Sequence, residues 1–167
     1  MADVLPRPGN GVREALVENI PAISKLYNEI EPDEPLSAEQ YRAWWTWLHI
    51  ENPQNRKLVR AAFGPDGACL GHLSAIALLF SVDGVETAAG FSCQLMVDES
   101  KRRSLLYASL IASLFKEYPN RGTAFMYSTV VRPRVLQGNL AVGFKRGPKL
   151  PVYLRPYHMG ALLRRAL

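Results

Sequence analysis

The chain of 167 residues is long enough for one domain with a buried core, and its composition, 48% hydrophobic and 21% charged, is that of a globular protein. Its longest uncharged run, residues 68–82, is too short to span a bilayer, so no membrane-spanning segment is expected. The net charge of +5 favours an anionic partner, such as a nucleic acid, a phosphorylated cofactor or a membrane surface.

Residues 1–11 are rich in proline and glycine and are expected to be flexible. They lack the apolar stretch of a signal peptide, so we expect a cytoplasmic protein. The two cysteines, Cys69 and Cys93, form no CxxC pair and have no histidine cluster nearby. A disulfide and a metal site are therefore both disfavoured.

The chain begins with a predicted strand at residues 12–16 and two predicted helices. Apolar residues at helical spacing indicate a helix from Ile20 to about Ile30, with Asn19 as its N-cap. Ser37 and Gln40 have the spacing of a capping box, which predicts a second helix that continues to about Asn52.

Three strands are predicted next, at residues 57–63, 68–80 and 85–97. Each neighbouring pair is separated by an Asp-Gly turn, at Asp66-Gly67 and Asp83-Gly84. Tight turns of this kind join antiparallel strands, so the three strands are expected to form an antiparallel meander.

The remaining segments alternate between helix and strand. They are a helix at 107–118, a buried strand at 123–131, a short helix from Pro133 to Gly143, a strand from Phe144, an apolar piece at 151–154 and a basic tail at 156–167 with the spacing of a helix. Helices between strands indicate parallel pairing, so the predicted class is α/β with a mixed sheet in one domain over residues 12–155.

This order of elements resembles the GNAT superfamily of N-acyltransferases. Three stretches support the resemblance: VREALVENIPAISKLYNEI at 12–30, Gly71-His72-Leu73 after the first Asp-Gly turn, and NLAVGF at 139–144. The resemblance implies a fold in which the antiparallel meander is followed by strand–helix–strand units.

The stretch VDESKRRSLL, residues 97–106, joins the last meander strand to a helix. In the family, this strand splays from its neighbour and pairs with the pantetheine arm of acyl-CoA. The next turn has an Arg/Gln-x-x-Gly-x-Gly/Ala pattern that binds the pyrophosphate. Here Arg102 matches the leading residue, but Leu105 and Tyr107 stand where the two small residues belong.

The resemblance implies that acetyl-CoA or another acyl-CoA is the co-substrate, without a metal ion. Basic side chains and Ser104 would replace the glycine contacts that the turn lacks. The residues expected to contact the cofactor are Leu95, Met96, Val97, Lys101, Arg102, Arg103, Ser104 and Leu105.

Acyl transfer to an amine needs a proton acceptor for the amine and a proton donor for the departing thiolate. Many family members have a donor tyrosine shortly before the GF pair, but Leu140 and Val142 occupy this neighbourhood here. Tyr127 is the nearest alternative acid. The candidates for the base are Cys93 and Gln94, near the strand end that meets the donor, His72 on the meander, and Glu29, Glu31 or Glu34 at the end of the first helix. Tyr127, Cys93 and His72 also fit an ordinary place in the core, and the glutamates an exposed surface.

The expected acceptor is a small-molecule amine or an amino sugar, and Trp47, which lies off the apolar stripe of its helix, can form a wall for it. Two alternatives stay open: an acyltransferase that uses an acyl carrier protein as donor, and a non-catalytic GNAT-like subunit or binding module of a larger assembly. The missing glycines and the missing tyrosine favour the second alternative.

The basic clusters are not interleaved with aromatic residues, so nucleic acid is not an expected partner. The tail has an apolar stripe at Met159, Leu162, Leu163 and Ala166, which predicts docking either on the protein's own core or on a partner subunit, a second copy of the chain or an anionic membrane surface. Membrane contact is expected to be peripheral at most.

Overall fold

The computed structural model describes residues 11–54, 56–129 and 132–147. Residues 1–10 of the expected flexible start, the apolar piece at 151–154 and the basic tail lie outside these ranges. No helix within them reaches the length and hydrophobicity that a membrane-spanning segment requires.

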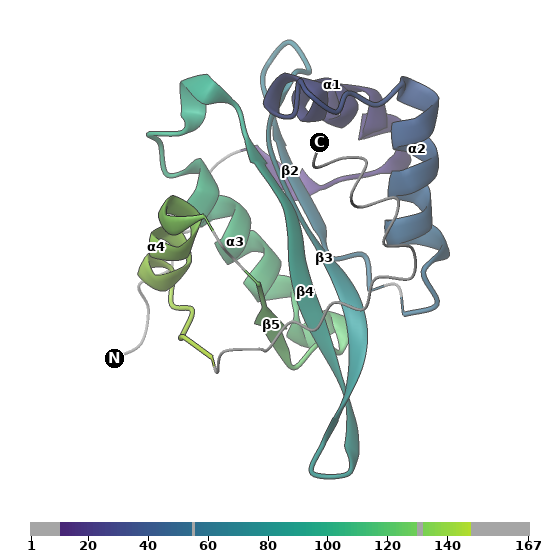
Figure 1. Cartoon of the computed structure of the whole chain (residues 1–167), viewed down its shortest axis with the longest axis vertical. Coiled ribbons are helices and arrows are strands. Elements are labelled where there is room, and N and C mark those ends of the chain that lie inside the picture. The colour runs from purple at the N-terminus through teal and green to yellow at the C-terminus, as the bar shows by residue number, and fades with distance from the viewer. Residues whose placement is uncertain (1–10, 55, 130–131, 148–167) are drawn as a thin grey trace, which may run out of the picture.

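A mixed five-stranded sheet runs through the middle of the domain, with its strands side by side in chain order (Figure 1). The strands are β1 (Val12–Glu14), β2 (Val59–Phe63), β3 (Cys69–Val82), β4 (Val85–Val97) and β5 (Phe125–Tyr127). The first four pair antiparallel, and β5 pairs parallel to β4. The predicted meander and the mixed α/β class are therefore confirmed.

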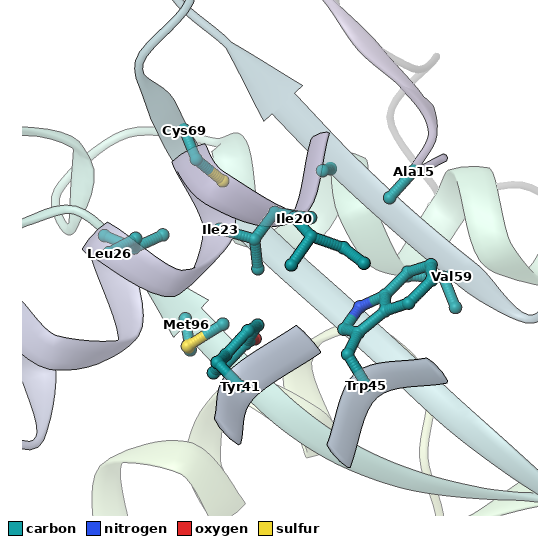
Figure 2. Close-up of a cluster of buried hydrophobic side chains, with 10 residues drawn as sticks. Ala15, Ile20, Ile23, Leu26, Tyr41, Trp45, Val59, Cys69 and Met96 are labelled. Atoms are coloured by element: carbon teal, nitrogen blue, oxygen red, sulfur yellow. The ribbon is translucent and has the colours of Figure 1, made fainter. Parts of the chain in front are cut away.

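Helices cover both faces of this sheet (Figure 1). One face packs against α1 (Ile20–Ile30) and α2 (Ala38–Thr46), and the other against α3 (Leu106–Glu117), beside which lies α4 (Pro133–Ala141). Figure 2 shows the first of the two cores, where Ile20 and Ile23 of α1 lie above Tyr41 and Trp45 of α2. Burial on both faces makes the sheet a rigid platform for the residues at its edge.

The two helix starts differ in how closely they follow the sequence prediction. The capping box of α2 is confirmed, since the Gln40 N–H donates to Ser37 Oγ at 3.1 Å and the Ser37 N–H to Gln40 Oε1 at 2.9 Å. Asn19 is the N-cap residue of α1, as predicted, but its side chain makes no capping bond to the helix, because Oδ1 accepts from the Leu16 N–H at 3.0 Å. The Asn19 N–H donates to the Leu16 carbonyl at 2.9 Å and closes a 3-10 turn, η1 (Val17–Asn19), in front of the helix.

The end of α2 widens into a π-helical turn, η2 (Trp47–Glu51). The wider turn places Leu48 and His49 inside the protein, whereas Trp47 stays 63% exposed as its position off the stripe predicted. Wide turns of this kind are frequent at functional sites because they reorient individual side chains.

Two strand predictions are wrong in the second half of the chain. Of the strand expected at 123–131, the described residues 123–129 contain only the three residues of β5, and these are not buried, since Phe125 is 40% exposed. Residues 144–147 form no strand. The Phe144 N–H donates to the Asn139 carbonyl at 3.0 Å and its ring packs on Phe115, so this segment closes the end of α4.

A buried charge cluster ties β1 and β2 to the end of α3. Arg60 is 4% exposed, and its guanidinium lies 3.8 Å from Glu14 and 3.6 Å from Glu117. Arg121 donates to the same Glu14 carboxylate at 2.8 Å. A buried guanidinium needs such partners, because an unpaired buried charge is strongly destabilising.

We predict that Glu14→Gln lowers the free energy of unfolding by about 2 kcal/mol, because it leaves two arginines with one carboxylate. Urea unfolding followed by circular dichroism measures the change. Glu18→Gln is the matched control, since Glu18 is exposed and nearby in the chain. Equal stability of the two variants would contradict a structural role for the cluster.

Candidate active site

A β-bulge interrupts β4 near its carboxyl end. Ser74 pairs with Cys93 and His72 pairs with Met96, so β4 contains one residue more than β3 between these two pairs. Gln94, within the bulge, has a φ of 48°, which is uncommon for a residue with a side chain. Bulges often lie next to active sites, because they change the direction of backbone and side-chain groups.

Before the bulge, the outer edge of β4 is covered by β5. The Ala88 carbonyl accepts from the Ala124 N–H at 2.9 Å, and pairing with β5 continues over Ala89 to Phe91. Within the described residues, no strand pairs with this edge beyond Phe91. The stretch from residue 92 to residue 97 therefore has an open edge of the kind the resemblance implies.

After the bulge, the alternation of backbone groups is shifted by one residue. The Asp98 N–H donates to the Leu70 carbonyl on β3 at 3.0 Å. Backbone groups of successive strand residues point to alternate sides, so those of Val97 and Leu95 point away from β3, to the open edge. Met96 points its backbone groups toward β3. Of the three strand residues expected to contact the cofactor, the register thus favours Leu95 and Val97 for main-chain contacts.

The basic turn after β4 contains a short 3-10 turn, η3 (Glu99–Lys101), that leads to α3. Ser104 Oγ donates to the Lys101 carbonyl at 2.7 Å and accepts from the Leu106 N–H at 3.2 Å. The amides of Leu105, Tyr107 and Ala108 have no acceptor within the described residues. Free amides at a helix start bind anions well, because the helix dipole adds to their charge.

Arginine side chains surround a surface hollow beside this turn. The hollow has a volume of about 510 Å³ and is lined by Glu99, Ser100, Arg102, Arg103 and Arg134. Arg102 is held in place by its Nε, which donates to the Val97 carbonyl at 3.3 Å. Arg134 comes from α4, and the sequence analysis missed it because only the fold brings this helix to the turn.

Leu105 and Tyr107 occupy the positions where the family pattern has small residues against the pyrophosphate, and their side chains lie in two different places. Leu105 is 72% exposed. Tyr107 instead reaches across to α4, where its hydroxyl hydrogen-bonds Asn139 Oδ1, and a Cβ added at Gly138 would lie 3.0 Å from its ring. The tyrosine therefore fills the space between the start of α3 and α4.

Tyr127 lies where β4 and β5 part, because it pairs with Phe91, the last residue of the shared ladder. Its ring packs between Phe80 and Phe91, at centroid distances of 5.3 and 5.2 Å. Burial raises the pKa of its phenol, so the group holds its proton at neutral pH. The role of this phenol as the acid in acyl transfer belongs to the function proposed below.

Cys93 directly precedes the bulge and is half-buried, with its Sγ 3.4 Å from Ser74 Oγ. Burial raises the pKa of its thiol. At neutral pH the side chain is therefore a thiol, which argues against a nucleophilic role and leaves it as part of the wall of the site.

Two buried histidines lie on the face of the sheet that α2 covers. His72 is fully buried, with Nδ1 3.1 Å from the Gln94 carbonyl oxygen, and burial lowers its pKa to about 4. His49 is 3% exposed, and burial, with His72 as a neighbour, lowers its pKa to about 3. Both imidazoles are neutral at pH 7. Sequence reasoning missed His49, because the π-helical turn that buries it has no sequence signal.

No protein-family model and no curated protein matches the chain. Solved structures do match it. An acetyltransferase from Trypanosoma brucei has 18% identity and a TM-score of 0.66, and the match covers 86% of this chain and 98% of that one. Glucosamine-6-phosphate N-acetyltransferase from Arabidopsis thaliana has 9% identity and a TM-score of 0.66 over 86% and 97% of the two chains.

The aminoglycoside N-acetyltransferase AAC(6')-Iy, in complex with the bisubstrate analogue CoA-S-monomethyl-acetylneamine, is a third match. It has 17% identity and a TM-score of 0.67, over 87% of this chain and 97% of that one. The chain thus has the GNAT acetyltransferase fold, which confirms the fold that the sequence resemblance implied.

We predict that the buried histidines make the protein less stable as the pH falls from about 6.5 to 4. An unfolded histidine binds a proton near pH 6.5, whereas folded His72 and His49 do so only near 4 and 3. Between these values the unfolded state binds more protons, so acid favours it, by about 1.4 kcal/mol per pH unit for each histidine.

Urea unfolding between pH 7 and 4 tests this, with His49→Phe as the comparison. Phenylalanine keeps an aromatic ring against Trp45, whose ring centroid lies 5.1 Å from that of His49, but cannot titrate. The variant should lose stability less steeply than the wild type. An identical slope in both proteins would show that His49 is not buried in its neutral form.

Proposed function

We propose that the protein is an N-acyltransferase that moves an acetyl or other acyl group from acyl-CoA to an amine, by direct attack in a ternary complex. The observation that supports this most is the open edge of β4 beside the arginine-lined hollow. A phosphate-binding hollow and a strand edge with free main-chain groups are the two features that an extended, anionic thioester needs.

In this proposal the phosphates of the cofactor lie in the hollow. Arg102, Arg103 and Arg134 supply charge-assisted hydrogen bonds, and Lys101 and Ser104 lie on the same exposed turn. The amides of Leu105 and its successors add the helix dipole. These contacts replace the close backbone approach that glycines would allow.

The pantetheine arm then runs along the open edge of β4 and pairs with the backbone of Val97 and Leu95. The thioester carbonyl accepts a hydrogen bond from the Leu95 N–H, which stabilises the oxyanion that forms when the amine attacks. The C–N bond forms and the C–S bond breaks, and Tyr127 gives its proton to the departing thiolate. Cys93 remains a thiol in the wall of the site.

The acceptor in this proposal is a small amine. The neighbours named above are acetyltransferases of an aminoglycoside and of glucosamine 6-phosphate, which supports an amino sugar or a similar compound. The exposed ring of Trp47 offers a flat surface to a sugar ring of this kind.

We predict that the protein binds acetyl-CoA and that Arg102→Ala with Arg103→Ala weakens binding about tenfold or more, because two charge-assisted contacts are lost. Isothermal titration calorimetry measures the affinity. Lys25→Ala with Arg42→Ala is the control, since it removes the same charge from exposed positions on α1 and α2. Equal losses in both double variants would indicate general charge attraction in place of a site.

Tyr107 favours a second candidate function, that of a GNAT-like binding module without catalysis. Its ring, bonded to Asn139, occupies space between α3 and α4 next to the hollow. If this ring limits the entry of the cofactor, the wild type binds acyl-CoA weakly or not at all, and the fold serves another role.

We predict that Tyr107→Ala tightens acetyl-CoA binding several-fold, because it opens this space, at a stability cost of about 1–2 kcal/mol for the lost ring contact and hydrogen bond. Tyr107→Phe keeps the ring and removes only the bond to Asn139, so its affinity should equal that of the wild type. Isothermal titration calorimetry measures the acetyl-CoA affinity of both variants and of the wild type. An unchanged affinity in Tyr107→Ala would mean that the ring does not obstruct the cofactor.

A further inference from the structure

Six buried side-chain polar atoms of the described residues have no well-aligned hydrogen bond, and five of them belong to residues under α2 or at the bulge. These five are Tyr41 Oη, Trp45 Nε1, His49 Nε2, His72 Nε2 and Gln94 Nε2. Native proteins leave few buried polar atoms unpaired, since each costs about 1–3 kcal/mol. His49 links several of these residues, since its ring centroid lies 5.1 Å from that of Trp45 and it interacts with both His72 and the Gln94 side chain. An ordered water molecule between them is the smallest occupant that would satisfy their unpaired atoms.

The tautomer of His72 follows from its one hydrogen bond. Nδ1 lies 3.1 Å from the Gln94 carbonyl oxygen, which can only accept, so Nδ1 has the proton. In a neutral imidazole the other nitrogen then has a lone pair. Nε2 of His72 is therefore a buried proton acceptor, held in orientation by the backbone of the bulge itself.

Three of the unpaired atoms can donate a hydrogen bond: the Tyr41 hydroxyl, the Trp45 indole N–H and the Gln94 amide. A water molecule that accepts from these donors could direct its own proton at His72 Nε2. The titratable neighbours are His49 from η2, Tyr41 from α2 and Cys93 from β4. Burial keeps all three uncharged at pH 7, so none competes electrostatically for the proton.

The cluster also approaches solvent on one side. Trp45 and His49 line a cavity of about 90 Å³ that Glu14 of β1 and Val59 of β2 also border. Gln94 is half-buried, belongs to the bulge and interacts with His49. His49 therefore connects the bulge with a cavity that has room for water.

We propose that His72 is the proton acceptor of the acyl transfer, acting through a water molecule held by Tyr41, Trp45 and Gln94. The proposal rests on the proposed acyltransferase function. As the amine nitrogen bonds to the thioester carbon, it loses a proton to the water, which passes one of its own to His72 Nε2. The thiolate takes up a proton from Tyr127, so no net proton is gained or lost, and the two side chains return to their first state through solvent.

The first test needs no catalysis. In protein labelled with ¹⁵N-histidine, the imidazole shifts should show His72 as the neutral Nδ1–H tautomer, with Nε2 unprotonated and hydrogen-bonded to water. A His72 found as the Nε2–H tautomer has no lone pair facing the cluster and overturns the proposal, whatever the protein's activity.

The second test separates proton transfer from support of the bulge. His72→Asn keeps an N–H close to the place of Nδ1 and removes Nε2, whereas His72→Gln keeps an amide near Nε2 and lacks the bond to the Gln94 carbonyl. Turnover of acetyl-CoA is measured as thiol release with a panel of primary amines and amino sugars. His72→Asn should lose about 10²- to 10⁴-fold in kcat with unchanged acetyl-CoA affinity, and the acid limb of the pH profile should vanish.

Wild-type kcat in His72→Asn, with a loss only in His72→Gln, would mean that His72 merely supports the bulge and would overturn the proposal. A wild type that binds acetyl-CoA but releases no thiol with any amine would refute the acyltransferase function instead, and the role of His72 with it. The imidazole tautomer distinguishes the two failures, because it is measured on the resting protein.

Discussion

The extra residue in β4 is the constraint on which the candidate site depends. Gln94 adopts a left-handed backbone conformation that costs about 1 kcal/mol or more, and its carbonyl is held by the buried imidazole of His72. Without this bulge the alternation along β4 would continue, and the Leu95 N–H would face β3. With it, the main chain of Leu95 faces an edge that β5 leaves open.

The two faces of the sheet present different kinds of side chain, because different helices cover them. The start of α3 and α4 supplies arginines and free helix amides, which suit an anionic cofactor. The face under α2 holds neutral imidazoles and unpaired donors, which suit proton transfer. The end of β4 contacts both regions, because the Gln94 carbonyl bonds His72 and the Val97 carbonyl bonds Arg102. Burial of the sheet on both faces holds this arrangement in place.

Periodicity and turn residues were sufficient to predict most of the fold. The Asp-Gly turns and the strands around them predicted the meander, and Ser37 with Gln40 predicted the start of α2. Short-range patterns do not encode where neighbouring strands part, so the strand around Tyr127 was predicted too long and the one from Phe144 was wrong. The basic turn was found from its charges, but Arg134 and His49 were not, since one is brought to the site by the packing of α4 and the other by a π-helical turn.

Nuclear magnetic resonance of the backbone amides during titration with acetyl-CoA tests the central claim most directly. The account predicts a large shift and slowed hydrogen exchange for the Leu95 N–H, which faces the open edge, and little change for the neighbouring Met96 N–H, which faces β3. The amides of Leu105, Tyr107 and Ala108 should shift with it as the phosphates bind. Saturable binding that leaves the Leu95 amide unperturbed, or that perturbs Met96 in its place, would contradict the account.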